Sequence, residues 1–233
     1  MQLSLVIPCY NEATNLEALT HRCLHLLEMA PVEIILVDNG STDNTAATLK
    51  QLVGSDDRFQ LIRVPINKGY GNGILQGLAV ARSGLMGWTH ADLQTDPIDV
   101  ERGIGILGKM DTSKALMVKG QRYSRPLSDS LFTAGMSAFE SVLLRARMWD
   151  INAQPTLFTR ALYEQWEKPP DDFSLDLYAY YQAIQAGHEV IRFPVIFGDR
   201  FSGQSHWNID FRSKSKFIRR TISYSLELAR TSR

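Results

Sequence analysis

The chain lacks most of the features that mark secreted, membrane-spanning or disordered proteins. Only two cysteines occur among 233 residues, too few for a disulfide scaffold, so we expect Cys9 and Cys23 to be buried, reduced thiols. No run of about 18 apolar residues is present, which predicts that nothing spans a membrane. The first residues carry no basic region and begin at once with a strand-like run, which excludes a signal peptide. These absences predict a cytoplasmic protein.

An excess of charge of one sign is also missing. The formal net charge is zero and 44% of the residues are hydrophobic, which fits a globular fold and argues against a disordered chain. A surface built as a whole for nucleic acid is equally disfavoured, so we expect no nucleic-acid partner. The charges are unevenly distributed along the chain. Residues 1–100 carry 6 basic and 11 acidic side chains, whereas residues 201–233 carry seven basic and two acidic ones.

Strand-like runs alternate with amphipathic helical patterns through the first half of the chain. The expected strands are 3–7, 32–37, 59–64, 85–89 and 116–119, separated by helices at 15–29, 45–53, 70–82 and 98–109. Helical patterns follow at 127–148, 159–166, 174–186 and about 213–229, with one more strand at 189–195. This order predicts an α/β fold with a mostly parallel central sheet flanked by helices and a helical C-terminal segment.

We expect one domain over residues 1–210, followed by a basic helix over 211–233. Its nucleotide-binding half would cover about 1–120 and its acceptor half about 121–210. Ligands of open α/β sheets sit beyond the carboxyl ends of the strands. Four such ends carry polar loops: Pro8-Cys9-Tyr10-Asn11-Glu12, Asp38-Asn39-Gly40-Ser41-Thr42-Asp43, Asn67-Lys68-Gly69-Tyr70-Gly71-Asn72-Gly73 and His90-Ala91-Asp92-Leu93-Gln94.

The loop after the fourth strand predicts a metal site. His90, Asp92 and Gln94 alternate along the chain, and alternate side chains of an extended segment share one side. A divalent cation held there, Mg²⁺ or Mn²⁺, would neutralise a pyrophosphate. The alternatives are that Asp92 caps the helix after Pro97 and that His90 only hydrogen-bonds the donor or a neighbouring loop.

The loops after the second and third strands are candidates for binding a nucleotide. The Asp38 carboxylate can accept hydrogen bonds from the N–H groups of uracil or guanine; its alternative is to cap the next helix, for which Ser41 and Asp43 are better placed. The glycines that follow Lys68 would let backbone amides approach a phosphate or a sugar, or would serve turns and packing. Their spacing is not a dinucleotide fingerprint, which disfavours a nicotinamide enzyme.

Two arginines and one aspartate complete the candidate set. Arg122 and Arg200 can each grip phosphate oxygens with a guanidinium fork, or can be solvated surface charges. Asp176 is the first candidate base if the acceptor is a hydroxyl, and Asp172 is the second. The alternative for Asp176 is an exposed helix charge or a charge in the cap region. A phosphate acceptor is already ionised and needs no base.

Together these motifs resemble family 2 glycosyltransferases of the GT-A fold, in the branch of polyprenyl (dolichyl) phosphate mannose or glucose synthases. The segments Gly120-Gln121-Arg122-Tyr123 and Arg200-Phe201-Ser202-Gly203-Gln204-Ser205-His206 extend the resemblance to roughly residues 3–206. The chain departs from the family pattern at a few positions. His90 and Asn39 each replace an aspartate, His206 replaces a lysine, and Gln154-Pro155 replaces Gly-Phe after Asp150.

The resemblance implies an inverting, metal-dependent transfer of a sugar from a GDP- or UDP-linked donor. It implies catalytic roles for Asp92, Asp176, Arg122 and Arg200, metal ligation by Asp92, Gln94 and His90, and donor binding by Pro8, Tyr10, Glu12, Asp38, Asn39, Lys68, Gly69 and Asp92. A polyprenyl-phosphate-type lipid is the expected acceptor. The alternatives are a saccharide hydroxyl in cell-surface polysaccharide assembly and a non-catalytic module that binds sugar nucleotides.

The basic end of the chain interleaves charged and apolar residues. Its members are Phe211, Arg212, Lys214, Lys216, Phe217, Ile218, Arg219, Arg220 and Ile222. Such a segment can lie on an anionic membrane surface, which would place the protein at the inner face of the membrane. The alternative is a solvated helix that packs on the domain.

Overall fold

A single twisted sheet organises the part of the chain that the structure describes. This computed structural model describes residues 2–114, 116–124, 126–187, 190–198 and 211–231, and only the backbone of 211–217. Within these residues seven strands pair in the order β3-β2-β1-β4-β6-β5-β7. They are β1 (Leu3–Cys9), β2 (Val32–Asn39), β3 (Phe59–Val64), β4 (Leu85–Trp88), β5 (Met117–Tyr123), β6 (Thr156–Thr159) and β7 (Ile191–Ile196). Only β6 runs antiparallel to its neighbours, so the predicted α/β class is confirmed.

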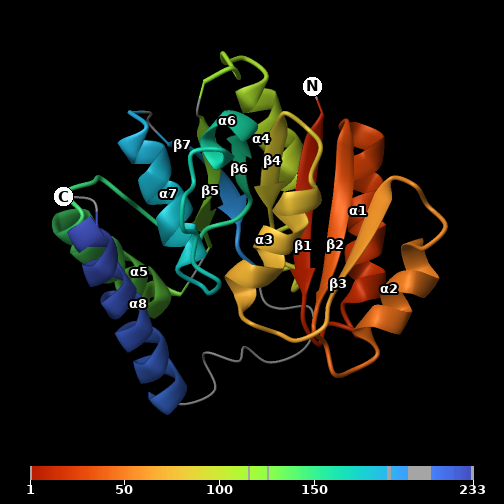
Figure 1. Cartoon of the computed structure of the whole chain (residues 1–233), viewed down its shortest axis with the longest axis horizontal. Coiled ribbons are helices and arrows are strands. Elements are labelled where there is room, and N and C mark those ends of the chain that lie inside the picture. Colours follow the sequence, from red (N-terminus) through yellow and green to blue (C-terminus); the bar gives the residue numbers. More distant parts are fainter. Residues whose placement is uncertain (1, 115, 125, 188–189, 199–210, 232–233) are drawn as a thin grey trace.

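Helices cover both faces of the sheet (Figure 1). They are α1 (Leu16–Met29), α2 (Thr45–Val53), α3 (Tyr70–Val80), α4 (Asp99–Leu107), α5 (Leu127–Leu143), α6 (Arg160–Tyr163), α7 (Leu175–Gln185) and α8 (Phe211–Thr231). Residues of β1 alternate between two hydrophobic clusters: Leu5 packs with α1, α2 and α4, whereas Val6 packs with α3 and α7. Cys9 and Cys23 are free and buried in the first of these clusters, as predicted.

The sequence analysis missed β6. It predicted a helix over 159–166, but residues Thr156–Thr159 form a buried strand and only the short α6 follows. Thr156 pairs with Trp88 of β4 on one side and with Lys119 of β5 on the other. The position of β6 depends on contacts with strands that are distant in the sequence, which a local hydrophobic pattern does not show.

Helix α5 ends at Leu143, earlier than the predicted Met148. Helix α8 lies beside α5 at the end of the molecule opposite α1 and α2 (Figure 1), and Ser225 Oγ of α8 donates a hydrogen bond of 2.7 Å to Glu140 Oε1 of α5. The predicted terminal helix is therefore present, while the division at residue 210 stays a prediction. Among the described residues, no helix has the length and apolar character needed to cross a membrane.

Candidate functional site

The carboxyl ends of β1 and β2 bring the first two predicted loops together. Cys9 pairs with Asp38 in the parallel register, so the residues that follow each strand are neighbours. The Asn11 backbone N–H donates to Ser41 Oγ at 3.1 Å, and Asn11 Oδ1 accepts from the Thr42 N–H at 2.8 Å. Pro8, Tyr10 and Glu12 are half-buried at the same edge of the sheet.

The end of β2 holds two buried acceptors that lack donors. Asp38 is 3% exposed; its Oδ1 accepts from the Ser41 N–H at 3.0 Å, whereas its Oδ2 has no hydrogen-bond partner and lies 3.6 Å from Arg63 Nε. Asn39 Nδ2 donates to the Gly69 carbonyl at 2.9 Å, which orients the amide and leaves Asn39 Oδ1 unpartnered. Buried polar atoms rarely stay unpaired. The two oxygens thus suit a ligand that brings N–H donors.

Asp38 does not cap α2. Asp43 takes that place, because its Oδ1 accepts from the Thr45 N–H at 2.9 Å. Burial raises the pKa of Asp43, but hydrogen bonds from Thr45 and Ala13 outweigh it and hold the pKa below its ordinary value. The capping alternative for Asp38 is therefore wrong, and its carboxylate is available for another role.

The glycines after β3 serve close packing. A Cβ at Gly69, whose φ is +138°, would meet the Asp171 carbonyl oxygen at 2.4 Å, and a Cβ at Gly71 would meet the Pro170 oxygen at 2.5 Å. The Asn72 N–H donates to the same Asp171 carbonyl at 2.8 Å. The segment before α7 thus packs on the start of α3, so Gly69 has a packing role. The predicted binding of the sugar nucleotide by Gly69 and by the exposed Lys68 stays a prediction.

The loop after β4 brings His90, Asp92 and Gln94 to the same edge. Asp92 is 4% exposed and its Oδ1 accepts from the Gln94 N–H at 3.2 Å. Asp96, rather than Asp92, accepts from the N–H of Ile98 at the start of α4 at 3.0 Å, so the capping alternative for Asp92 is wrong. Gln94 Nε2 donates to the Gly198 carbonyl at 3.3 Å.

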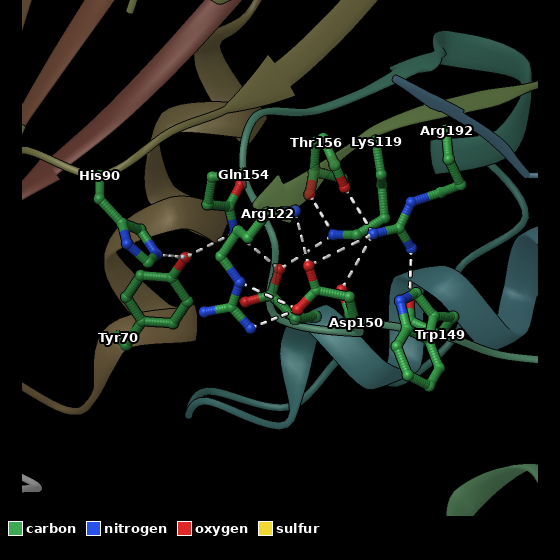
Figure 2. A network of polar contacts seen from close by, with 11 residues as sticks. Tyr70, His90, Lys119, Arg122, Trp149, Asp150, Gln154, Thr156 and Arg192 are labelled. Atoms are coloured by element: carbon green, nitrogen blue, oxygen red, sulfur yellow. Dashed lines mark hydrogen bonds and ion pairs between the residues drawn. The ribbon is translucent and has the colours of Figure 1, made fainter. Parts of the chain in front are cut away.

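A chain of polar contacts runs from the half-buried His90 into the core (Figure 2). His90 Nε2 lies 2.8 Å from Tyr70 Oη, and Gln154 Nε2 donates to Tyr70 Oη at 3.4 Å and to Asp176 Oδ1 at 2.8 Å. The Tyr70 ring also stacks on Phe173, with centroids 4.7 Å apart. Burial raises the pKa of Tyr70 well above its ordinary value, so the phenol stays protonated.

Lys119 closes this chain inside the core. Its side chain is 0% exposed and its Nζ lies 3.4 Å from Asp176 Oδ1, whose own side chain is 2% exposed. Lys119 also donates to Thr156 Oγ1, its partner across the β5–β6 pair, and lies 6.0 Å from the centroid of the Trp88 ring. Burial lowers the pKa of Lys119 to about 8, although Asp176 opposes that shift. Asp176 is thus a buried partner of a lysine, and the exposed-helix alternative is wrong.

Arg122 belongs to a second buried ion pair. Its backbone N–H donates to Asp150 Oδ2 at 2.8 Å and its Nε donates to Asp150 Oδ1 at 2.9 Å, with 12% of the Arg122 side chain exposed. Burial raises the pKa of Asp150, but Arg122 and Arg192 hold it below its ordinary value. Arg122 is therefore not a solvated surface charge, and its contact with phosphate stays a prediction. Arg200 and His206 lie outside the described residues.

The sequence analysis missed Tyr70, Lys119, Thr156 and Arg192 as members of the site. Of these residues, only Lys119 could have been identified from the sequence, because it directly follows the apolar run Leu116-Met117-Val118 in a predicted strand. Charged residues are almost never fully buried unless they are paired, so a lysine there indicates a buried partner. Its partner Asp176 lies on a distant helix. Nothing in the sequence joins the two.

The comparison with family models decides the family. The model described as Glycosyl transferase family 2 matches residues 4–228. The chain belongs to glycosyl transferase family 2. This confirms the resemblance drawn from the four strand-end loops.

Two curated relatives match part of the chain. A dodecaprenyl-phosphate galacturonate synthase of Rhizobium johnstonii is 30% identical over 135 residues, which cover 57% of this chain and 38% of the relative. An undecaprenyl-phosphate 4-deoxy-4-formamido-L-arabinose transferase of Pectobacterium carotovorum is 38% identical over 104 residues, which cover 43% and 32% respectively. The chain thus spans about a third of the length of the curated relatives that it matches.

Solved glycosyltransferases share the fold of this family 2 chain. A glucosyl-3-phosphoglycerate synthase of Mycobacterium tuberculosis, solved with Mn²⁺, UDP and its product, has a TM-score of 0.72 at 18% identity and matches 98% of this chain and 79% of that one. A mannosyltransferase of Pyrobaculum calidifontis, solved with GDP-mannose and Mn²⁺, has a TM-score of 0.64 at 17% identity and matches 98% and 73%. At these identities the likeness confirms the GT-A fold.

The loop after β4 offers a few ligand atoms to a divalent metal. They fit a metal whose other ligands come from a bound diphosphate. Within the described ranges no cluster of three or more His, Cys, Asp or Glu is arranged to hold an ion. Asp92 offers carboxylate oxygen and His90 imidazole nitrogen, so most of the coordination shell would come from a diphosphate and water. A mixed oxygen and nitrogen set suits Mn²⁺ better than Mg²⁺.

Proposed function

We propose that this family 2 chain transfers a sugar from a nucleoside diphosphate sugar to a lipid-linked phosphate, with inversion at the anomeric carbon and a divalent metal. Binding of the nucleotide sugar is supported by two buried oxygens that accept no hydrogen bond, Asp38 Oδ2 and Asn39 Oδ1. Both are acceptors, and the ring N–H of uracil or guanine is a matching donor. Tyr10 and Glu12 would line the opposite wall, and Lys68 would reach the phosphates.

The curated relatives and the burial of Asp176 favour a phosphate acceptor. Both relatives are named for products or substrates on polyprenyl phosphates. A hydroxyl acceptor requires a base that can reach it, whereas the carboxylate of Asp176 is buried against Lys119 and Gln154. A phosphate oxygen attacks in its ionised form. The lipid acceptor is therefore preferred over a saccharide hydroxyl, and the protein would work at the inner face of a membrane.

The reaction exchanges one bond at the anomeric carbon. The acceptor phosphate oxygen forms a bond to that carbon as the bond to the donor diphosphate breaks, and negative charge develops on the leaving diphosphate. A divalent cation held by Asp92, and by His90 or Gln94, would neutralise this charge. Arg122 and Arg200 would orient phosphate oxygens of the donor or acceptor.

Nucleotide binding and transfer can be tested separately. A thermal-shift screen of UDP, GDP and their sugars, with Mn²⁺ or with chelator, identifies the base, because a ligand of the native state raises Tm. Sugar transfer is then measured to a short, water-soluble polyprenyl phosphate and to an oligosaccharide. Asp38→Asn is expected to weaken nucleotide binding, and Asp92→Asn is expected to remove the metal-dependent part of the shift.

Asp111→Asn is the matched control, because Asp111 is an exposed aspartate in the loop after α4. The proposal fails if no nucleotide stabilises the protein, or if Asp92→Asn transfers sugar at the parent rate. Binding without transfer to either acceptor would favour the non-catalytic module. Transfer to the oligosaccharide alone would favour the saccharide acceptor.

A further inference from the structure

Asp150 has a backbone conformation that residues other than glycine rarely adopt. Its φ is +46°, in the left-handed region, and only 2% of the residue is exposed. Aspartate tolerates this region better than most residues do, but the conformation still costs energy and persists only where the surrounding structure fixes it. Conformations of this kind cluster at sites that hold ligands. The contacts that fix Asp150 therefore indicate what it does.

Two side chains fix the backbone of Asp150, one at its N–H and one at its carbonyl. The N–H donates to Ser137 Oγ of α5 at 3.1 Å, and the carbonyl accepts from Arg192 Nη2 of β7 at 3.1 Å. The Arg192 guanidinium also donates to the carbonyls of Trp149 and Gly120, and 13% of the Arg192 side chain is exposed. A planar guanidinium can hold several acceptors in fixed directions. Arg192 therefore connects residues 149–150 to β5.

The Asp150 carboxylate holds Arg122 at two places. Oδ2 accepts from the Arg122 backbone N–H at 2.8 Å, whereas Oδ1 accepts from Nε at 2.9 Å and from Nη2. Because one carboxylate binds both the backbone and the guanidinium, the side chain between them is held in one conformation. The ring of Phe197, with its centroid 5.0 Å from Arg122 Cζ, covers one face of the guanidinium.

Arg122 Nη1 has no hydrogen-bond partner among the residues that the structure describes. Figure 2 shows its guanidinium between the Asp150 carboxylate and the side chains of Tyr70 and His90, which belong to the candidate site. Arg122 and Arg192 share the single carboxylate of Asp150, so two positive charges face one negative charge. An arginine that is held in one direction, with its charge not fully compensated, suits a phosphate oxygen.

We propose that Asp150 and Arg192 are positioning residues for a phosphate ligand. Arg192 holds the backbone of Asp150, and the Asp150 carboxylate directs Nη1 of Arg122 toward a phosphate oxygen; neither positioning residue touches the ligand. The inference rests on the proposed function for the class of ligand, which is the diphosphate of the donor or the phosphate of the acceptor. Binding of such a ligand is measured without sugar transfer, so a failure of the proposed transfer is distinguishable from a failure of this inference.

Asp150→Asn distinguishes positioning from a simple effect of charge, because the two predict opposite signs. Asparagine tolerates a φ of +46°, but its amide has one acceptor oxygen and places N–H donors against Arg122. The variant also lacks a negative charge, so charge alone would strengthen the binding of a phosphate. Loss of the fixed direction of Arg122 is instead expected to weaken it at least about tenfold.

Affinity is measured by isothermal titration calorimetry of the full chain with geranyl phosphate and, separately, with UDP and GDP in the presence of Mn²⁺. Geranyl phosphate represents a lipid-linked acceptor, and the nucleotides represent the diphosphate of the donor. The probe that loses affinity in Asp150→Asn identifies the phosphate that Arg122 binds.

Asp129→Asn is the matched control, because Asp129 is exposed on α5 and its replacement changes the net charge equally. Its affinity for each probe should stay within about twofold of the parent value. Arg122→Gln should lose affinity for the same probe as Asp150→Asn. Since Asp150 acts through Arg122, adding Asp150→Asn to Arg122→Gln should cause no further loss. Circular dichroism and Tm establish that each variant is folded at the temperature of the titration.

Arg192→Lys keeps the positive charge but loses the planar fork, so it should weaken binding of the same probe. Arg82→Lys, at an exposed arginine, should not. The proposal is overturned if the parent binds no probe, if Asp150→Asn binds each probe as tightly as the parent or more tightly, or if its loss of affinity persists in the Arg122→Gln background. If Asp150→Asn does not fold, unchanged affinities in Arg192→Lys overturn it. A parent that binds geranyl phosphate but no nucleotide, with this binding lost in Asp150→Asn, contradicts the proposed function and supports the inference.

Discussion

Replacing Lys119 by methionine is expected to lower the free energy of unfolding by about 3–5 kcal/mol. Methionine keeps the length of the side chain but removes the charge, so Asp176 would be left as a carboxylate that is 2% exposed and has no cation beside it. Removing one partner of a buried ion pair typically costs this amount because the other charge stays desolvated. For a chain of 233 residues the loss corresponds to a fall in Tm of about 6–20 °C.

The measurement is urea unfolding of the parent and the variant, with Lys114→Met as the matched control. Lys114 and Asp111 also lie 3.6 Å apart, but their side chains are 61% and 57% exposed, so the control should lose less than about 1 kcal/mol. The double variant Lys119→Met/Asp176→Asn should recover most of the lost stability, because the orphaned charge is gone while Gln154 still has an acceptor. A loss below about 1 kcal/mol for Lys119→Met, or no recovery in the double variant, would refute the reasoning.

Three further outcomes follow from the same structure. Tyr70→Phe should lower kcat more than it raises KM, because the variant keeps the ring but releases His90 Nε2; equal kinetics for parent and variant would show that the contact does not position His90. Burial raises the pKa of Glu140 to about 7, so the folded state holds more protons than the unfolded state between pH 4.5 and 7, and its stability falls as pH rises through that window. Glu140→Gln should therefore be more stable than the parent at pH 8 and nearly equal to it at pH 4.5, as measured by urea unfolding. Burial also raises the pKa of the Cys9 and Cys23 thiols, Cys23 to about 12, so a thiol reagent at pH 8 should label neither until the protein is denatured.

The sequence predicted the first half of the fold, because the strands and helices there have regular hydrophobic patterns. Leu3–Cys9 through Leu85–Trp88 alternate with amphipathic helices, and in parallel order their carboxyl ends must meet at one edge. That was sufficient to predict that the loops after β2 and β4, which hold Asp38 and Asp92, lie at the same edge of the sheet. The antiparallel β6 could not be found in this way, because it lies between two strands that are each distant from it in sequence.

Individual roles at the site depended on tertiary contacts that no local pattern encodes. The glycine at position 69 was consistent with an approach to phosphate or with packing, and its contact with the segment before α7 shows the packing role. Arg122 was consistent with phosphate binding or with solvent exposure, and the structure shows a third arrangement, an ion pair with Asp150. Sequence identifies which residue types gather at the edge of a sheet. It does not identify their partners.

Two departures from the family pattern occur in one hydrogen-bonded chain. His90 replaces an aspartate after β4 and Gln154 replaces a glycine before β6, and both contact the same hydroxyl of Tyr70. A carboxylate at position 90 would add a second negative charge to the hydrogen-bonded chain that ends at the buried Asp176, and like charges disfavour each other in a medium of low dielectric constant. An imidazole adds no negative charge, and the Gln154 amide donates a hydrogen bond to Asp176. The substitutions are therefore coupled through Tyr70, so restoring aspartate at position 90 alone should destabilise the chain unless Gln154 and Tyr70 change with it.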